Sequence, residues 1–402
     1  MHHSFISDFK KNYYKYIYLI LICLFLGVSK LDLILKEVDK YGFGENRLIS
    51  TIPNIPSNKD EYLVFSNKFD DYLKDNIGLR SNLIHYYNQI NFYIFHDIST
   101  KNVTRGKNDF LFLNQDGNSI SDHFGFTKLR TKFELEQFAK RIQESHDYIE
   151  SKGIPYVFIL APNKITIYPE YLPDRYIYNK EENQITDQLL NYLKANTNVT
   201  IIDLRKVMIE TKKMCNPYGQ FDSHWNLCGS SAAYKYIIEQ IEIKKKFKVN
   251  EINHSVIDTS KCDWGELARM YTKVHPEKLL RDREGCYEYE VKYDNNSCDT
   301  KRSKGIWTFN VACNKNYQYQ RAIIFHDSFF SQLSGFFTRS FKETSFVLDR
   351  LGKNKLQQQL FTEEMEACGY DSCGPDISII DTDIVIEQWV ERYFNFKGHA
   401  WY

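Results

Sequence analysis

The chain has 402 residues, an apolar fraction of 43% and 52 acidic against 52 basic residues, so its formal net charge is zero. This length and composition allow one large hydrophobic core or two smaller ones. The balanced charge gives no basis for binding nucleic acid or another polyanion, so no nucleic-acid partner is expected.

Residues 1–35 are predicted to form a signal-anchor or a signal peptide. An almost wholly apolar run covers 16–28, and it reaches the length of about twenty residues that spans a bilayer only with its flanks. Gly27 and Ser29 form a small-residue pair that suits a cleavage site, so a cleaved signal peptide is the alternative. The basic residues that precede the run, and that favour a cytoplasmic N-terminus, are Lys10, Lys11 and Lys15. Both alternatives carry the rest of the chain across the membrane.

Residues 36–125 are predicted to be an N-terminal extension without chemistry of its own. Helical periodicity runs over 62–73 and again over 81–95, and 103–113 has the pattern of a hairpin or strand pair with Gly106 inside it.

The remainder, 126–402, alternates helical and strand patterns. Continuous apolar strands that alternate with helices predict an α/β fold with a parallel sheet covered on both faces. The predicted helices are 133–150, 185–193, 229–241 and 329–341, and the predicted strands are 156–160, 199–204, 322–325, 345–348 and 384–386. Periodicity is poor over about 244–316, which is therefore interpreted as an insertion.

Eight cysteines follow the apolar run, and an oxidising compartment would pair them as disulfides. They are Cys215, Cys228, Cys262, Cys286, Cys298, Cys313, Cys368 and Cys373. The simplest connectivity joins chain neighbours: 215–228, 262–286, 298–313 and 368–373. A zinc site is the alternative, but no Cys-x-x-Cys is present and the spacings are irregular, so no metal is expected.

Asp222, His224 and Ser328 form a candidate Ser-His-Asp triad. In such a triad the histidine takes the serine proton and the aspartate fixes its tautomer. Ser328 follows the predicted strand 322–325 and precedes a helix, which places its hydroxyl at the carboxyl edge of the sheet, where ligands bind in such folds. The backbone N–H groups of the helix start are expected nearby to receive an oxyanion.

In the order of its motifs the chain resembles the alginate O-acetyltransferase family of SGNH-like proteins, the AlgX/AlgJ type. The motifs that carry the resemblance are Glu45-Asn46-Arg47, 75–80, 106–112, Ala161-Pro162-Asn163-Lys164, 168–173, 222–226, 264–268 and Glu391-Arg392. Within 106–112, Asp109 and Phe110 replace the family's Gly and Trp.

The resemblance implies an SGNH-hydrolase-like fold with a permuted motif order and an enzyme that moves acetyl groups onto an extracytoplasmic polysaccharide. It implies Ser328 as nucleophile, His224 as base and Asp222 as the orienting acid, with no cofactor. It further implies a polysaccharide acceptor, an acetyl donor route through a membrane-bound O-acyltransferase partner, and a place at the periplasmic face of the bacterial inner membrane, or in the periplasm after cleavage.

One departure is His326, which stands where the family usually has Gly. It narrows the site or adds a second imidazole, and it is the one residue that hints at an inert triad. Two alternatives to the acetyltransferase remain open. A carbohydrate O-acetylesterase would use the same triad with water as the acceptor, and a non-catalytic glycan-binding or assembly protein would keep the fold with an inert triad.

Four further residues are candidates for the oxyanion or the substrate. For Asn163 the two interpretations are an amide donor to the oxyanion and a cap of a turn. For Lys164 and Arg392 they are steering of an anionic glycan and ordinary solvent exposure. Trp225 stacks on a sugar or packs beneath His224, and packing is the preferred interpretation. Ser223 is expected to point away from its two neighbours because side chains alternate along an extended segment.

Overall fold

The computed structural model describes most of the predicted catalytic domain and part of the N-terminal region. Its longer described ranges are 50–76 (57 excepted), 102–114, 129–176, 185–249, 321–348 and 382–395. Shorter described stretches are 15 and 17–20, parts of 86–95, 120, 254–258, 265–271, 289–293, 299–301 and 308–312. Two compact units divide the chain: Met1–Ser99 with Arg269–Lys278, and Thr100–Ala268 with Leu279–Tyr402.

The first unit contains helix α2 (Lys59–Asn76), which covers the predicted helical stretch 62–73. The stretch predicted as a second helix, 81–95, and the apolar run 16–28 lie largely outside the described residues. Among the residues that are described, no helix is both long enough and apolar enough to span a membrane.

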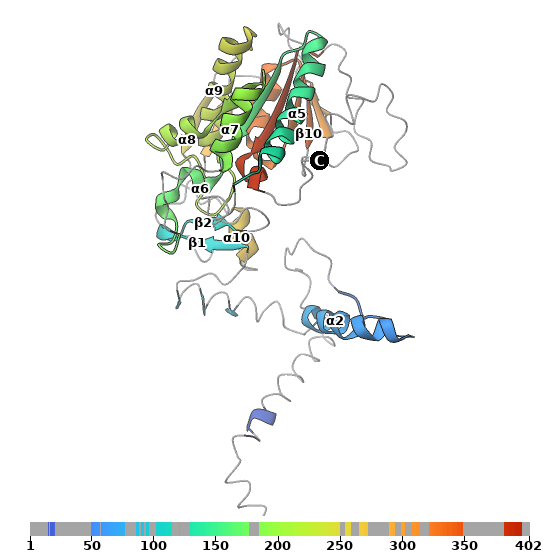
Figure 1. Cartoon of the computed structure of the whole chain (residues 1–402). Helices are drawn as coiled ribbons and strands as arrows, with labels where there is room; N and C mark the ends of the chain where they lie inside the picture. Colours follow the sequence, from blue (N-terminus) through green and yellow to red (C-terminus); the bar gives the residue numbers. More distant parts are fainter. Residues whose placement is uncertain are drawn as a thin grey trace, which may run out of the picture. The chain divides into compact units, whose positions relative to one another are not determined.

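The second unit is built on a seven-stranded sheet in the order β4-β3-β11-β9-β10-β8-β7. Its first five strands run parallel, and they confirm the five strands predicted from apolar runs. They are β3 (Tyr156–Ala161), β4 (Thr200–Asp203), β9 (Arg321–His326), β10 (Glu343–Leu348) and β11 (Ile384–Val390). Figure 1 shows the sheet between its flanking helices.

Two antiparallel strands extend this sheet beyond β10. They are β8 (Thr308–Ala312), which pairs with β10, and β7 (Asp299–Lys301), which pairs with β8. Both come from the 244–316 region, which its poor periodicity predicted to be a disulfide-bearing insertion. The same region supplies β5 (His254–Asp258), which pairs with β6 (Tyr289–Tyr293) in a separate antiparallel pair.

Helices cover both faces of the sheet, as predicted. On one face, α5 (Lys132–Ser151) and α7 (Ile185–Asn196) pack over side chains of β3 such as Tyr156 and Phe158. The other face is covered by α8 (Arg205–Thr211), α9 (Leu227–Lys245) and α12 (Ser331–Ser340). Every residue of β3 and β11 is buried, as expected of central parallel strands, and in β11 this includes Glu387 and Gln388.

Local sequence signals fix the ends of α5. Thr131 accepts a hydrogen bond from the Glu134 amide, and the Glu134 carboxylate accepts one from the Thr131 amide, which makes a capping box. After the helix, Gly153 has a φ of 77°, a left-handed conformation that favours glycine, and the chain turns there into β3.

The predicted hairpin is present as β1 (Val103–Arg105) and β2 (Leu111–Leu113), joined through the 3-10 helix η1 (Lys107–Asp109). The Leu111 amide donates to the Gln220 carbonyl over 3.0 Å, just before the Asp-x-His motif. The hairpin therefore belongs to the second unit, whereas the sequence analysis placed it in the extension 36–125.

Candidate active site

Ser328 lies at the carboxyl edge of the sheet, two residues beyond the end of β9. Asp327 holds this turn: its Oδ2 accepts a hydrogen bond from the Val390 amide at 2.6 Å, and its Oδ1 accepts from the Phe329 amide at 2.8 Å and from Gln388 Nε2 at 3.1 Å. Burial raises the pKa of Asp327, although these hydrogen bonds oppose the shift. The Asp327 carboxylate thus ties the nucleophile turn to the neighbouring strand β11.

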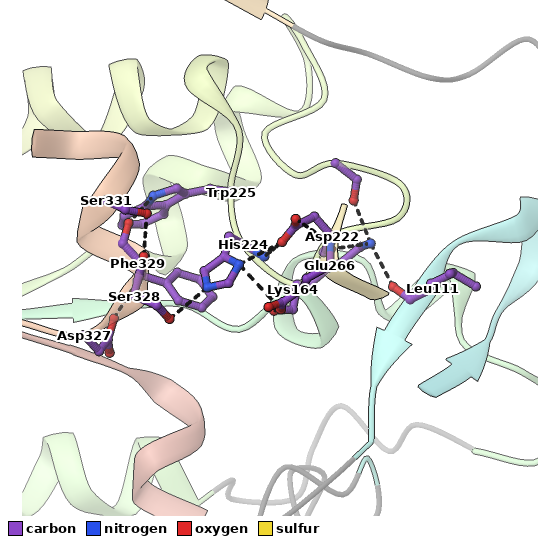
Figure 2. Close-up of polar contacts among 12 residues, drawn as sticks. Leu111, Lys164, Asp222, His224, Trp225, Glu266, Asp327, Ser328, Phe329 and Ser331 are labelled. Carbon is purple, nitrogen blue, oxygen red and sulfur yellow. Dashed lines mark hydrogen bonds and ion pairs between the residues drawn. The ribbon is translucent and has the colours of Figure 1, made fainter. Parts of the chain in front are cut away.

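His224 bridges the other two members of the predicted triad. Its Nε2 lies 2.8 Å from Ser328 Oγ, and its Nδ1 lies 2.8 Å from Asp222 Oδ1 (Figure 2). Both distances are those of hydrogen bonds. The fold therefore brings Ser328 next to the pair Asp222 and His224, although 104 residues separate Ser328 from His224 in the sequence.

Asp222 is held on both of its oxygens. Oδ1 also accepts from the His224 amide at 2.9 Å, and Oδ2 accepts from the Glu266 amide at 2.9 Å. Burial alone would raise the pKa of Asp222, but the hydrogen bonds from His224 and Glu266 outweigh it and lower that pKa well below its usual range. The carboxylate is thus ionised at neutral pH and fixes the orientation of the imidazole.

Trp225 packs beneath the site and does not face a ligand. Its ring is 1% exposed, and its indole N–H donates to the Phe329 carbonyl over 2.8 Å. This burial agrees with the preferred interpretation that Trp225 packs beneath His224. Asn226 caps the following helix, because its side-chain oxygen accepts from the amides of Cys228 and Gly229 at 3.0 and 3.1 Å.

Lys164 is buried (1% exposed), so it can neither steer a glycan nor be solvated as the sequence analysis considered. Its ammonium lies within 2.7–2.9 Å of the backbone carbonyls of Leu111, Gly219, Gln220 and Asp222. Figure 2 shows the ammonium between strand β2 and the Asp222 loop. Buried carbonyl oxygens favour a nearby donor, and the Gln220 carbonyl accepts from the Leu111 amide as well. Lys164 thus fixes the backbone at the acid of the triad.

Arg392 and Asn163 are also buried, at 9% and 2% exposure. The Arg392 guanidinium lies 5.1 Å from the centre of the Phe329 ring and 3.4 Å from Ser223 Oγ, so the interpretation of a solvated residue is wrong. The Asn163 amide N–H donates to Glu391 Oε2 over 2.9 Å, and the Asn163 side chain makes no cap hydrogen bond to helix α6 (Lys164–Ile167). A role for Asn163 at an oxyanion stays a prediction.

The amides at the helix start are occupied. Phe329 N–H donates to Asp327 Oδ1, Phe330 N–H donates to the Asp327 carbonyl at 3.2 Å, and Ser331 N–H donates to the Ser328 carbonyl. These three amides hold the 3-10 helix η3 (Ser328–Phe330), so of the helix-start amides predicted as oxyanion donors the Ser328 amide is the one that remains. Within the described part of the chain, the Ser328 amide has no acceptor.

His326 points away from the reaction. Its Nδ1 donates to the Asp327 carbonyl over 2.7 Å, and its ring lies against Phe330 and Phe346. Nε2 is buried and has no partner among the described residues. Burial lowers the pKa of His326 to about 4, so the ring is neutral at physiological pH.

A disulfide joins Cys215 and Cys228, as the sequence predicts, and it brackets the loop that carries Asp222 and His224. The other six cysteines beyond the apolar run lie outside the described residues.

Glu266, at the start of α10 (Glu266–Tyr271), is a site residue that sequence reasoning missed. Its Oε1 lies 3.5 Å from His224 Nδ1 and accepts a short hydrogen bond from Ser223 Oγ. One side-chain nitrogen or oxygen atom from each of Asp222, His224 and Glu266 lies within 4.8 Å of the others. The only sequence signal was the resemblance of 264–268 to a family motif.

The model of a family described as "SGNH hydrolase-like domain, acetyltransferase AlgX" matches residues 103–306, just over half of the chain. The match includes Asp222 and His224 and ends before Ser328. No significant match exists among curated proteins.

Three solved structures that are similar to this chain illustrate the fold likeness. The O-acetyltransferase domain of Pseudomonas putida AlgJ has a TM-score of 0.48 at 14% identity, over 74% of this chain and 94% of that one. Bacillus cereus PatB1 has a TM-score of 0.47 at 16% identity, over 72% and 98%. Pseudomonas aeruginosa AlgX has a TM-score of 0.41 at 14% identity, over 74% and 63%. On the match of the family model, the chain belongs to the family of SGNH hydrolase-like acetyltransferases of the AlgX type.

Proposed function

We propose that this chain is an O-acetyltransferase that moves an acetyl group onto hydroxyls of an extracytoplasmic polysaccharide through an acyl-Ser328 intermediate. Membership of the AlgX-type family supports O-acetyl transfer to polysaccharide. The single observation that carries the mechanism is the unbroken hydrogen-bonded line from Asp222 through His224 to Ser328.

In the first half-reaction, Ser328 Oγ attacks the carbonyl carbon of the acetyl donor while its proton moves to His224 Nε2. The bond from the acetyl group to the donor's leaving oxygen breaks, and His224 returns the proton to that oxygen. In the second half-reaction, a sugar hydroxyl gives its proton to His224 and attacks the acyl-serine. The ester bond to Ser328 Oγ breaks, and His224 protonates that oxygen.

The ionised Asp222 carboxylate keeps a proton on His224 Nδ1, so Nε2 is free to accept in both steps. The Ser328 amide and the Asn163 side chain are the proposed donors to the oxyanion. A negative charge that develops on the carbonyl oxygen gains most from donors that are already in place.

The acetyl donor is proposed to reach Ser328 through a membrane-bound O-acyltransferase partner. The chain is proposed to work outside the cytoplasm, anchored to the membrane by its N-terminal segment. The Cys215–Cys228 disulfide supports an oxidising compartment.

Intact-mass analysis after incubation with p-nitrophenyl acetate tests the intermediate. We expect an acetyl adduct on the wild-type chain that is absent from Ser328→Ala and that disappears when an oligosaccharide is added, with acetyl appearing on the sugar. Acetate released to water at the same rate with and without the oligosaccharide would instead favour a carbohydrate O-acetylesterase. Absence of both products would favour a glycan-binding protein.

A further inference from the structure

The mechanism above does not use Glu266, yet its carboxylate faces the same imidazole nitrogen as Asp222. Glu266 Oε1 lies 3.5 Å from His224 Nδ1, and Asp222 Oδ1 lies 2.8 Å from it. Two carboxylates therefore lie on the side of the ring that is opposite Ser328 (Figure 2).

The backbone that carries Glu266 is pressed against the Asp222 loop. A Cβ at Gly265 would lie 2.3 Å from the Phe221 carbonyl oxygen, so only glycine permits this approach. The Leu267 amide donates to the Phe221 carbonyl over 3.0 Å, and the Glu266 amide donates to Asp222 Oδ2. The position of the Glu266 backbone is thus fixed relative to the triad.

The Glu266 side chain is fixed as well. Ser223, which is 1% exposed, donates its hydroxyl to Glu266 Oε1, and Arg392 Nη1 lies 3.4 Å from the same hydroxyl oxygen. Among the described residues, the partners of the Ser223 hydroxyl are Glu266 and Arg392 rather than Asp222 or His224. A line of contacts from Arg392 through Ser223 therefore holds the carboxylate beside His224.

We propose that Glu266 is a second positioning residue of the triad, which acts through His224 by stabilising the imidazolium formed in each half-reaction. This inference rests on the proposed function. Near the ring, the negative groups are Asp222 and Glu266. The positive groups are Arg392, which contacts Ser223 Oγ, and Lys164, which donates to the Asp222 carbonyl. The buried carboxylate of Asp327, next to Ser328 in the chain, accepts from the Val390 amide at the end of β11. Because the Glu266 side chain is 34% exposed, solvent screens part of its charge.

The test is Glu266→Gln, which removes the charge but keeps the backbone N–H that Asp222 accepts. The assay is the transfer of acetyl from p-nitrophenyl acetate to an oligosaccharide. We expect the acidic limb of its pH–rate profile to shift to lower pH by about half a pH unit to one pH unit. The plateau rate should fall about threefold to tenfold, because the weaker base takes up a proton less readily.

Two variants control for loop damage. Glu266→Asp keeps the charge and should return the limb toward the wild-type position. Glu343→Gln removes a carboxylate of similar exposure (32%) that is paired with Arg321. Glu343 stands at the start of β10, at the opposite end of the parallel strands from Ser328, so this variant should change neither the acidic limb nor the plateau rate. An acidic limb that stays in place in Glu266→Gln, with or without a loss of rate, would overturn the inference, because a merely structural residue gives that result.

A measurement without turnover separates this inference from the proposed function. In Ser328→Ala, NMR follows the titration of the His224 ring with and without the additional Glu266→Gln change. We expect the midpoint to be lower by the same half unit to one unit when Glu266 is neutral. Equal midpoints would refute the role of Glu266 even if transfer were confirmed. A wild-type chain that transfers no acetyl group would refute the proposed function and leave this comparison valid.

Discussion

His224 and Ser328 are joined at two consecutive positions of their loops. His224 Nε2 lies 2.8 Å from Ser328 Oγ, and the next residue of each loop is also bonded, because Trp225 Nε1 donates to the Phe329 carbonyl over 2.8 Å. The buried Trp225 thus holds the backbone next to His224 and fixes the distance between the imidazole and Ser328. Such support matters because a displacement of about 1 Å can cost about a hundredfold in rate.

The triad should act as one unit. Ser328→Ala and His224→Ala are each expected to reduce kcat for acetyl transfer by at least about three orders of magnitude, and Asp222→Asn by a comparable factor through the wrong imidazole tautomer. The triple variant should be scarcely slower than Ser328→Ala, since residues of one unit are not additive. The measurement is the steady-state rate with a fixed oligosaccharide, alongside the denaturant midpoint of each variant. A fully active His224→Ala would overturn the mechanism.

Lys164 should be essential to stability although it touches no substrate. Lys164→Met keeps the length of the side chain but leaves the four carbonyls around the ammonium without their buried donor. Lost hydrogen bonds from a charged group cost about 1.5–3 kcal/mol each, so we expect the free energy of unfolding to fall by at least about 3 kcal/mol. Urea denaturation measures this free energy of unfolding. Lys206→Met, at a side chain that is 88% exposed, is the matched control and should change it by less than about 0.5 kcal/mol.

The disulfide should stabilise the loop of Asp222 and His224. It closes a loop over a sequence separation of 13 residues, for which the chain-entropy model gives about 3 kcal/mol. A Cys215→Ser, Cys228→Ser double variant should therefore unfold at lower urea concentration and transfer acetyl more slowly. Because other cysteines also respond to reductant, the control compares the effect of dithiothreitol on the wild-type chain and on the double variant. Equal effects would show that this bond contributes nothing.

Sequence patterns were sufficient where the physical signal is local. Apolar runs identified all five parallel strands, since a strand buried on both faces is mostly apolar, although β11 also buries Glu387 and Gln388. The Asp-x-His spacing also predicted two residues that the structure places beside Ser328, because both lie on one short loop. Patterns were insufficient where the partner is distant in the chain. No residue near Lys164 in the sequence indicates that its ammonium binds four backbone carbonyls. Glu266 contacts His224 from a region whose poor periodicity gave no helix or strand prediction.

His326 should weaken the fold in acid without acting as the base. Its folded pKa of about 4 lies below the ordinary value of about 6.5, so between these values the unfolded chain binds the proton and the folded chain does not. Stability from the neutral ring is therefore fully present above about pH 6.5 and is lost as the pH falls toward 4. At pH 4.5 the loss should reach about 2–3 kcal/mol relative to pH 7.

His326→Gln removes this titration. Urea unfolding at pH 7 and at pH 4.5 should show a stability difference that is smaller in the variant by about 2–3 kcal/mol, because the carboxylates titrate alike in both proteins. Since His326 Nδ1 is bonded to the Asp327 carbonyl and its ring is buried between Phe330 and Phe346, transfer at pH 7 should stay within a few-fold of wild type. Loss of transfer in His326→Gln together with an active His224→Ala would show instead that His326 is the base.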